Sequence, residues 1–174
     1  MKHSNNEKNC QIIIYTDGAA IGNPGPAAYA ALLRYICNGK VIAEKEISGG
    51  FSKSTNNRAE LWAVVKALEA VKKHNIPVIV VSDSKYIVDS VNNNWLIKWE
   101  AENWKQRPNA DLWKTLLQQI KKIHNISFQW TKGHASNELN NRVDKIANSL
   151  AQKIKSGEFN APPDPGFVEM RKMF

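Results

Sequence analysis

The sequence has few cysteines and no long apolar run. Its 174 residues include only two cysteines, Cys10 and Cys37, which form no C-x-x-C pair and have no pair of histidines nearby. A zinc site and a disulfide framework are therefore poorly supported, and we expect both side chains to pack as small apolar groups. No apolar run approaches the ~20 residues of a membrane helix, and residues 1–9 lack the apolar stretch of a signal peptide. We expect a cytoplasmic protein with no membrane partner.

Two common catalytic motifs are also missing. The sequence contains no G-x-S-x-G segment, which would place a nucleophilic serine on a sharp turn. The glycine-rich segment 22–26 lacks the Gly-Lys-Ser/Thr ending with which a P-loop holds phosphates. These absences argue against a serine hydrolase of that type and against a P-loop nucleotide-binding protein.

Positive charge is present in excess. Lys and Arg number 24 against 16 Asp and Glu, which leaves a formal net charge of +8. A surplus of this size attracts polyanions, so nucleic acid is the first partner to consider. With 43% hydrophobic and 23% charged residues the composition is that of a globular chain, and the length suits one domain. We expect a monomer with no obligate protein partner.

Hydrophobic periodicity predicts an α/β domain. Apolar runs predict strands at 10–16, 27–35, 41–48, 78–81 and 126–131, and apolar residues three and four apart predict helices at 57–73, 110–124 and 140–155. Asn38-Gly39 predicts an antiparallel hairpin, and the strand, helix, strand order around 57–73 predicts a parallel crossover. We expect a mixed sheet with helices on its faces over residues 10–156, a short extension at 1–9 and a proline-containing tail at 157–174.

Two aspartates follow predicted strands directly. Asp17 comes after the first strand and Asp83 after the strand at 78–81, each followed by a small residue. If these strands are parallel neighbours, the two carboxylates lie about one strand spacing apart, ~5 Å, at the edge where open α/β sheets carry their sites. Turn or helix N-cap roles for either aspartate remain open.

Two more acids lie on the core-facing sides of predicted helices. Glu60 shares the apolar stripe of its helix, and Asp144 precedes Ala147 on a face of small residues. Glu60 is also compatible with a capping box to Asn57, and Asp144 with an ion pair on its own helix. Taken together, four acids from four elements repel one another unless divalent cations lie between them. All-oxygen ligation suits Mg²⁺ or Mn²⁺, and two such ions about 3.5 to 4 Å apart suit phosphodiester hydrolysis.

Five motifs of the sequence resemble type 1 ribonuclease H, the bacterial-type ribonuclease HI family, in order and spacing. They are Thr16-Asp17-Gly18-Ala19, Gly22-Asn23-Pro24-Gly25-Pro26, Thr55-Asn56-Asn57-Arg58-Ala59-Glu60, Ser82-Asp83-Ser84, and Lys132-Gly133-His134-Ala135 continuing through Asn140 to Asp144. The resemblance runs from about Ile12 to Ala151, nearly the whole folded chain. It implies a ribonuclease H-like fold with a five-stranded mixed sheet of order 3-2-1-4-5, in which strand 2 is antiparallel.

The resemblance also implies an activity and a catalytic set. The implied reaction is endonucleolytic hydrolysis of the RNA strand of RNA/DNA hybrids, leaving 3′-hydroxyl and 5′-phosphate ends, with two Mg²⁺ ions for which Mn²⁺ substitutes. Asp17, Glu60, Asp83 and Asp144 are implied as metal-binding and catalytic acids. His134 is implied as a mobile-loop histidine that aids proton transfer or product release, although a solvated loop histidine fits the sequence equally well.

Contacts to the hybrid are implied at further positions. Minor-groove and phosphate contacts are implied for Gly18, Asn23, Thr55, Asn56 and Asn57, and a contact at Lys85. Turn and cap chemistry is an alternative for the asparagines. The segment with Trp95 and Lys98 resembles a basic protrusion that grips the DNA strand, whereas the spacing of Trp95 and Trp99 favours mutual packing and the lysines also fit a solvated face.

The sequence departs from the family pattern at several places. Lys85 stands where many relatives carry Gln, so a charged phosphate contact is expected in place of a hydrogen bond. Asn141 stands where some relatives have a further carboxylate, so an extra acid in metal exchange either comes from Glu138 or is absent. Glu100 and Glu102 make the protrusion less basic. Only nine residues precede the first strand, so we expect no separate N-terminal hybrid-binding domain.

Two other functions remain to be weighed. A related nuclease would use the same acids on DNA, and Asn56-Asn57 with the His134 motif argue against it. A nucleic-acid-binding module without catalysis would have lost at least one acid, whereas all four are present.

Overall fold

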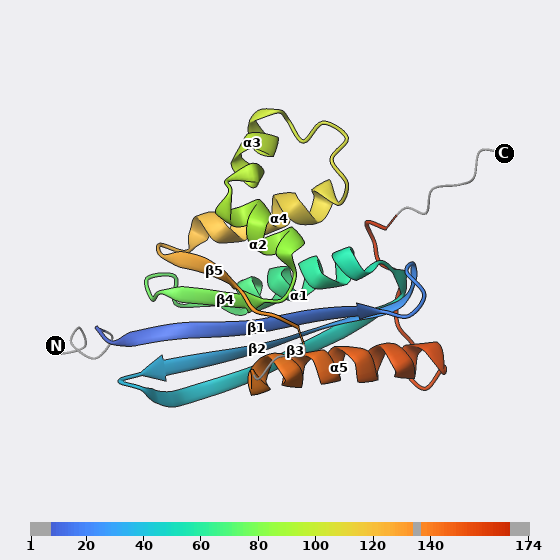
Figure 1. Cartoon of the computed structure of the whole chain (residues 1–174), viewed down its shortest axis with the longest axis horizontal. Coiled ribbons are helices and arrows are strands. Elements are labelled where there is room, and N and C mark those ends of the chain that lie inside the picture. The colour runs from blue at the N-terminus through green and yellow to red at the C-terminus, as the bar shows by residue number, and fades with distance from the viewer. Residues whose placement is uncertain (1–7, 134–136, 168–174) are drawn as a thin grey trace.

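A computed structural model describes residues 8–133 and 137–167, and within them five strands form one sheet with helices on both sides (Figure 1). The strands are β1 (Cys10–Ala20), β2 (Gly25–Cys37), β3 (Lys40–Ser54), β4 (Val78–Ser82) and β5 (Ile126–Trp130). The helices are α1 (Asn56–Ala70), α2 (Lys85–Asn92), α3 (Trp95–Ala101), α4 (Ala110–Lys122) and α5 (Glu138–Lys155). No helix in the described ranges is long and apolar enough to cross a membrane.

The sheet has the order β3-β2-β1-β4-β5, as the family resemblance implied. β2 runs antiparallel to β1 and to β3, while β4 runs parallel to both β1 and β5. The β2–β3 connection is the predicted hairpin, with Asn38 and Gly39 both at positive φ, a conformation that these two residue types tolerate best. The parallel β1–β4 pair follows from the crossover through α1.

Helices cover the two faces of the sheet unequally. α1 packs against β1 and β2 and against α4, whereas α5 lies alone on the opposite face across β1, β2 and β3 (Figure 1). The core under α1 and α4 holds large side chains, including the fully buried Trp113. The core under α5 is built from small residues such as Ala28, Ala30, Ala147 and Ala151. Small side chains let α5 approach the sheet closely, which brings Asp144 toward β1.

The strands on the antiparallel side are longer than periodicity predicts. β1 continues through Asp17 to Ala20, because Gly18 and Ala19 keep pairing with Tyr29 and Ala28 on β2. Asp17 is therefore a residue within a strand and not one that ends it. Small residues interrupt the apolar alternation without interrupting the backbone ladder, so the sequence pattern ends earlier than the strand does.

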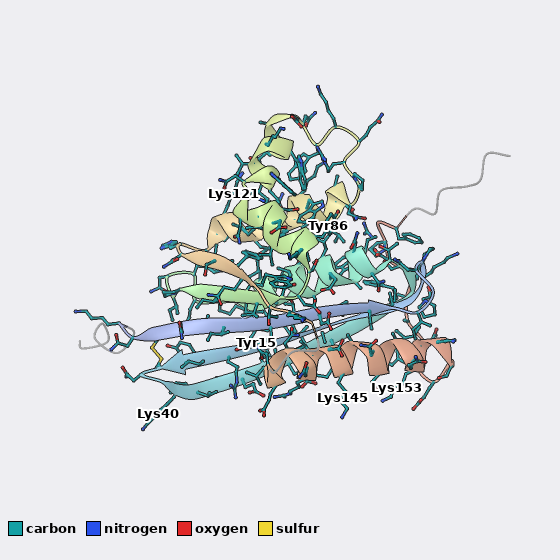
Figure 2. The ribbon with its side chains drawn as sticks, viewed as in Figure 1. Tyr15, Lys40, Tyr86, Lys121, Lys145 and Lys153 are labelled. Carbon is teal, nitrogen blue, oxygen red and sulfur yellow. A yellow bond between two sulfur atoms is a disulfide. The ribbon has the colours of Figure 1, made fainter. Side chains whose placement is uncertain are left out.

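The expected state of Cys10 and Cys37 is wrong. The two residues are directly opposite on the antiparallel β1–β2 pair, with their Cα atoms 4.1 Å apart, and their sulfurs form a disulfide, visible in yellow in Figure 2. Their separation of 27 residues has none of the spacings that mark paired cysteines. Only the strand register places them together.

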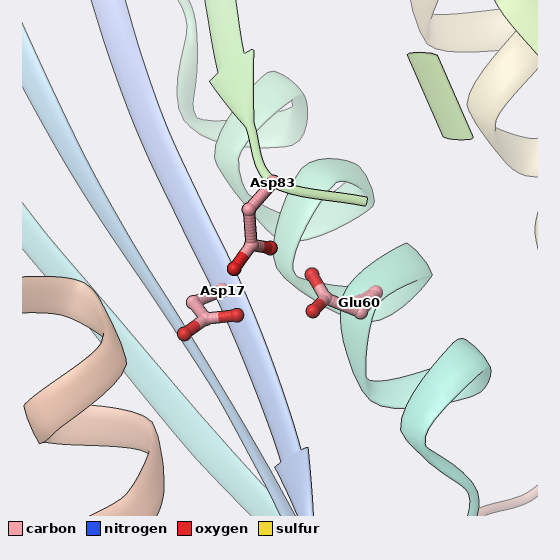
Figure 3. Close-up of side chains that lie close together, drawn as sticks. All are labelled: Asp17, Glu60 and Asp83. Atoms are coloured by element: carbon pink, nitrogen blue, oxygen red, sulfur yellow. The ribbon is translucent and has the colours of Figure 1, made fainter. Parts of the chain in front are cut away.

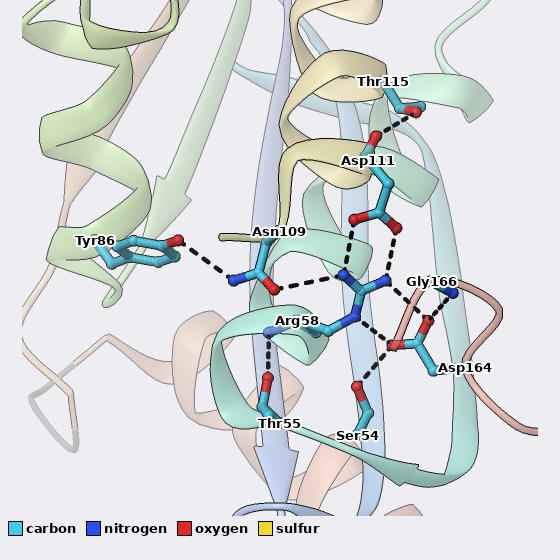
Figure 4. Close-up of polar contacts among 9 residues, drawn as sticks. All are labelled: Ser54, Thr55, Arg58, Tyr86, Asn109, Asp111, Thr115, Asp164 and Gly166. Atoms are coloured by element: carbon cyan, nitrogen blue, oxygen red, sulfur yellow. Dashed lines mark hydrogen bonds and ion pairs between the residues drawn. The ribbon is translucent and has the colours of Figure 1, made fainter. Parts of the chain in front are cut away.

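The segment after α5 packs back onto the start of α1. Arg58 is 3% exposed and donates from Nε to Asp164 Oδ2 at 2.7 Å and from Nη2 to Asp164 Oδ1 at 3.0 Å (Figure 4). The same guanidinium forms two hydrogen bonds of 2.8 Å with Asp111 at the start of α4, and the Ser54 hydroxyl donates to Asp164 at 2.7 Å. Arg58 therefore joins α1, α4 and the tail through charge-assisted hydrogen bonds.

We predict that Asp164→Asn lowers the free energy of unfolding by about 3 kcal/mol, because it leaves the buried Arg58 charge without one partner. Burial alone would raise the pKa of Asp164, but hydrogen bonds from Arg58 and Ser54 outweigh it and hold that pKa below its usual value. The contribution of ionised Asp164 to the free energy of unfolding is therefore present above about pH 4 and declines as pH falls through the lowered pKa.

Urea unfolding of wild type and variant near neutral pH measures this difference. Glu158→Gln, a change of an exposed carboxylate on the same tail, is the matched control and should shift stability by less than about 0.5 kcal/mol. Equal stability of Asp164→Asn and wild type would show that the tail contact contributes nothing.

Candidate functional site

The parallel register of β1 and β4 brings Asp17 and Asp83 together. Thr16 is paired with Ser82, so the residue that follows each of them is an aspartate, and the two aspartates lie side by side (Figure 3). Asp83 is not a helix cap, because Ser84 is the N-cap of α2 and accepts from the Ile87 amide. The predicted approach of these two carboxylates is therefore what the fold produces.

Glu60 reaches the same place because a glycine lets α1 lie against β1. A Cβ built on Gly18 would lie 2.4 Å from the backbone nitrogen of Glu60, so no larger residue fits there without moving the helix. The N-cap of α1 is Thr55, whose hydroxyl accepts from the Arg58 amide at 3.2 Å. The helix start is thus capped without Glu60 and Asn57, and the Glu60 carboxylate extends toward the two aspartates.

Asp17, Glu60 and Asp83 form a close carboxylate cluster. One oxygen from each lies within 4.8 Å of the others, and Asp17 is 3% exposed (Figure 3). Burial, with further raising contributions from the Asp83 charge and the Asp144 carboxyl, outweighs the lowering effect of a Glu60 hydrogen bond and raises the pKa of Asp17 to about 7. Burial and the charge of Asp17 also raise the pKa of Glu60 well above its usual value. Without a counter-charge this cluster holds protons.

The donor set fits a hard divalent cation. Glu60 Oε2 is buried and has no hydrogen-bond partner within the described chain, which is costly unless something positive binds it. All three side chains offer carboxylate oxygens, the ligand type that Mg²⁺ and Mn²⁺ prefer. The cluster is thus suited to hold metal.

The fourth predicted acid lies at the margin of this cluster. Asp144, on α5, is close enough to help raise the pKa of Asp17, but it is not one of the three residues whose oxygens meet within 4.8 Å. Its Oδ1 accepts from Asn148 Nδ2 at 3.0 Å, one turn along α5. The intrahelical ion pair considered for Asp144 is not what the structure shows, because its partner here is a neutral amide.

Two asparagines of the predicted hybrid contacts tie their loops together. Asn56 Oδ1 accepts from the Ala20 amide at 2.8 Å, and Asn23 Oδ1 accepts from the Asn56 amide at 3.0 Å. These bonds fix the start of α1 against the loop after β1, while Asn56 and Asn57 remain exposed. The turn chemistry considered for Asn23 and Asn56 is therefore present, and it holds both residues at one surface beside the carboxylates.

The protrusion is built from α3 and the segment before α4. Trp95 is 44% exposed and its ring packs against Trp99, with centroids 6.4 Å apart, as their spacing predicted. Arg107 stacks on the other tryptophan, 4.4 Å from the ring centroid of Trp99. Lys98 is exposed on the same helix, so the protrusion presents basic and aromatic groups.

The acids that reduce the basic character of the protrusion are paired. Glu100 accepts two hydrogen bonds from Lys121 on α4, and Glu102 lies 4.0 Å from Arg107. Such exposed pairs add little to stability, but they neutralise the acids locally.

His134 lies outside the described residues. Glu138 is the first residue of α5, while Asn137 caps that helix by accepting from the amides of Leu139 and Asn140. The sequence predicts a strand over 126–131 but indicates no separate role for Trp130 or Arg58. The structure exposes Trp130 at 46% and buries Arg58. Neither outcome has a local signal, because both depend on what packs beside them.

Known proteins match this chain over most of its length. A profile of the RNase H family matches residues 9–152. The ribonuclease H of Syntrophus aciditrophicus is 41% identical over 162 residues, which cover 90% of this chain and 87% of that protein. The ribonuclease H of Nitratidesulfovibrio vulgaris (strain DP4) is 42% identical over 162 residues, covering 90% of this chain and 96% of that protein.

Solved structures agree with the sequence matches. LC9-RNase H1, a type 1 RNase H with the type 2 active-site motif, aligns with a TM-score of 0.71 at 25% identity and covers 83% of this chain and 73% of that chain. LC11-RNase H1, solved in complex with RNA/DNA hybrid, aligns with a TM-score of 0.62 at 27% identity and covers 82% of this chain and 98% of that chain. With its sheet order, its carboxylate cluster and these matches, the chain belongs to the ribonuclease H family.

Proposed function

We propose that this protein is an endonuclease that hydrolyses the RNA strand of RNA/DNA hybrids and leaves 3′-hydroxyl and 5′-phosphate ends. The observation that carries the proposal is the convergence of Asp17, Glu60 and Asp83 from three elements, with a buried Glu60 oxygen that lacks a protein partner. Relatives named ribonuclease H, and a related enzyme solved with RNA/DNA hybrid, support the substrate. We further propose that the protein acts as a cytoplasmic monomer.

The four acids are the proposed ligands for two divalent ions, Mg²⁺ with Mn²⁺ as a substitute. When bound, such ions activate water for attack and stabilise the charge that develops on the leaving oxygen. Asp17 lies between the other acids, because Glu60 and Asp83 meet it on one side and Asp144 acts on it from α5. His134, which falls between β5 and α5 in the sequence, is proposed to move a proton or to assist product release.

Selection of a hybrid is proposed to come from two surfaces on either side of the acids. Asn23 and Asn56 are joined at the start of α1, where Asn56 and Asn57 are exposed. These asparagines, together with Gly18, are proposed to contact the 2′-hydroxyls that an RNA strand displays in the minor groove. On the same surface Thr55 is proposed to contact a phosphate of the DNA strand.

The protrusion is the second surface, with Trp95 and Lys98 proposed to contact the DNA strand. Because most of these contacts are to backbone and sugar, we expect affinity without strong sequence readout.

We predict that a panel of labelled substrates identifies the reaction. With Mg²⁺, cleavage of the RNA strand of a hybrid should exceed cleavage of duplex RNA and duplex DNA by at least about 10²-fold, because only the hybrid offers 2′-hydroxyls and a DNA strand together. Comparable cleavage of duplex DNA would favour the related DNA nuclease. Hybrid binding without cleavage in either Mg²⁺ or Mn²⁺ would favour the non-catalytic binding module.

We predict that Asp17→Asn lowers kcat on the hybrid by about 10³-fold or more, because it removes a charged ligand at the centre of the acid cluster. Initial rates with a labelled hybrid measure the loss, and circular dichroism checks folding. Asp89→Asn changes an exposed acid on α2 in the same way and should retain wild-type rates. Retained activity of Asp17→Asn would contradict its assignment.

We predict that Mg²⁺ raises the Tm by about 5 °C near pH 8 and by much less near pH 5. Because the pKa of Asp17 is raised to about 7 in the folded metal-free chain, that chain binds a proton that the unfolded chain releases near pH 4. The contribution of this group to the free energy of unfolding is therefore fully present below about pH 4 and is lost as pH rises toward 7.

Bound Mg²⁺ would replace that proton, so its stabilising effect should increase over the same pH range. Thermal unfolding with Mg²⁺ and with chelator, followed across this range, is the measurement. A Mg²⁺ effect that does not change with pH would contradict metal binding at these acids.

A further inference from the structure

Trp130 is an exposed tryptophan with defined contacts beside the acid cluster. It is the last residue of β5, and its backbone is paired with Ser82, which directly precedes Asp83. Alternation along β5 places it on the same side of the sheet as Phe128, which is 5% exposed, yet Trp130 is 46% exposed. Core packing therefore does not account for this large aromatic side chain.

Two contacts connect Trp130 to the site. Its indole Nε1 donates to the backbone oxygen of Asp83 at 3.0 Å, and the Lys85 Nζ atom lies over its ring, 4.7 Å from the centroid. Asp83 is one of the clustered acids, while Lys85 is an exposed cation two residues further along the chain. One side chain thus supports both a carboxylate of the site and the cation next to it.

We propose that Trp130 is a positioning residue: its ring holds the Lys85 ammonium where a backbone phosphate of the nucleic acid binds, and its indole N–H fixes the Asp83 backbone. The phosphate contact rests on the proposed function, whereas the two supporting contacts are in the structure itself. Trp130 thus holds both the proposed phosphate-binding group, Lys85, and a member of the acid cluster, Asp83.

The contact with the ring gives Lys85 an advantage for binding an anion. A free lysine side chain loses rotamer freedom when it binds, whereas one already held against an aromatic face has less to lose. The ammonium has three N–H donors, so while one side of it faces the ring, donors remain to bind a phosphate. A neutral amide at this position would gain little from the ring, so the Lys85–Trp130 pair acts as a unit.

The indole bond to the Asp83 backbone oxygen is one of several contacts that hold the chain in place at this point. The ladder between β4 and β5 continues past Trp130, with the Thr131 amide donating to the Ser82 oxygen at 2.9 Å. A Cβ built on Gly133 would lie 3.0 Å from Asp83 Oδ2, so the segment after β5 passes close to that carboxylate. The indole bond therefore belongs to a set of contacts from the end of β5 that orients Asp83.

The test uses Lys85→Ala, Trp130→Phe and the double variant, with Lys153→Ala as a control that removes an exposed lysine from the far end of α5. Hybrid binding is measured by fluorescence anisotropy with Ca²⁺ in place of Mg²⁺, over a range of salt concentrations. Steady-state cleavage with Mg²⁺ gives kcat and KM separately, and thermal unfolding reports on stability.

We expect Lys85→Ala to raise Kd about 5-fold and to lower the slope of log affinity against log salt by about 0.9, with little change in kcat. Trp130→Phe keeps a ring but loses the indole N–H and part of the cation–π attraction. It should raise Kd about 2-fold and lower kcat about 5-fold, with the salt slope nearly unchanged. The double variant should bind no more weakly than Lys85→Ala alone, since the ring acts on affinity through the lysine.

Two results would overturn the proposal. One is independent, multiplying effects of the two substitutions on Kd. The other is a Trp130→Phe variant that is less stable but retains wild-type kcat and Kd, which would show a purely structural role. If the wild-type chain fails to cleave hybrid, the proposed function is wrong, yet the binding measurements with Ca²⁺ still test the Lys85–Trp130 pair.

Discussion

Repulsion among the clustered carboxylates, which are shielded from water, is the constraint on which the rest of the structure depends. Asp17, Glu60 and Asp83 meet where β4 ends beside β1, and burial there weakens the screening that water gives to surface charges. Chains that are free to move would separate such groups. Here they remain together because each is attached to a different rigid element, and each element is held by contacts remote from the carboxylates.

Those contacts are made of backbone and of one buried cation. The β1–β4 ladder sets the separation of the two aspartates, and Gly18 permits the approach of α1 that brings in Glu60. Two residues before Glu60, Arg58 binds Asp111 and Asp164, so the beginning of the helix is held from the side opposite the acids. These contacts thus stabilise the elements that carry the acids, while the closeness of the acids is itself destabilising. Such a cost is common where a site is preorganised for function.

The net charge of +8 combines a local cluster of acids with a larger number of basic side chains elsewhere, and the two have opposite effects on a polyanion. The acid cluster repels a phosphate backbone by itself, while the protrusion and Lys85 carry the positive charge that is proposed to attract one. The acids of the protrusion are paired with Lys121 and Arg107, which reduces their effect on a bound strand. Under the proposed function, divalent cations neutralise the acid cluster before a phosphate backbone can lie over it, so metal and substrate binding would depend on each other.

The sequence by itself determined the five strands, three of the helices and the mixed α/β class, because hydrophobic periodicity is a local signal, and it singled out four acids as a candidate set. Tertiary structure alone decided which distant residues touch. The Cys10–Cys37 disulfide follows from strand register, the burial of Arg58 from the returning tail, and the exposure of Trp130 from the uncovered end of β5. Contacts of this kind depend on register and packing between segments far apart in the chain, and no local pattern of residue types encodes them.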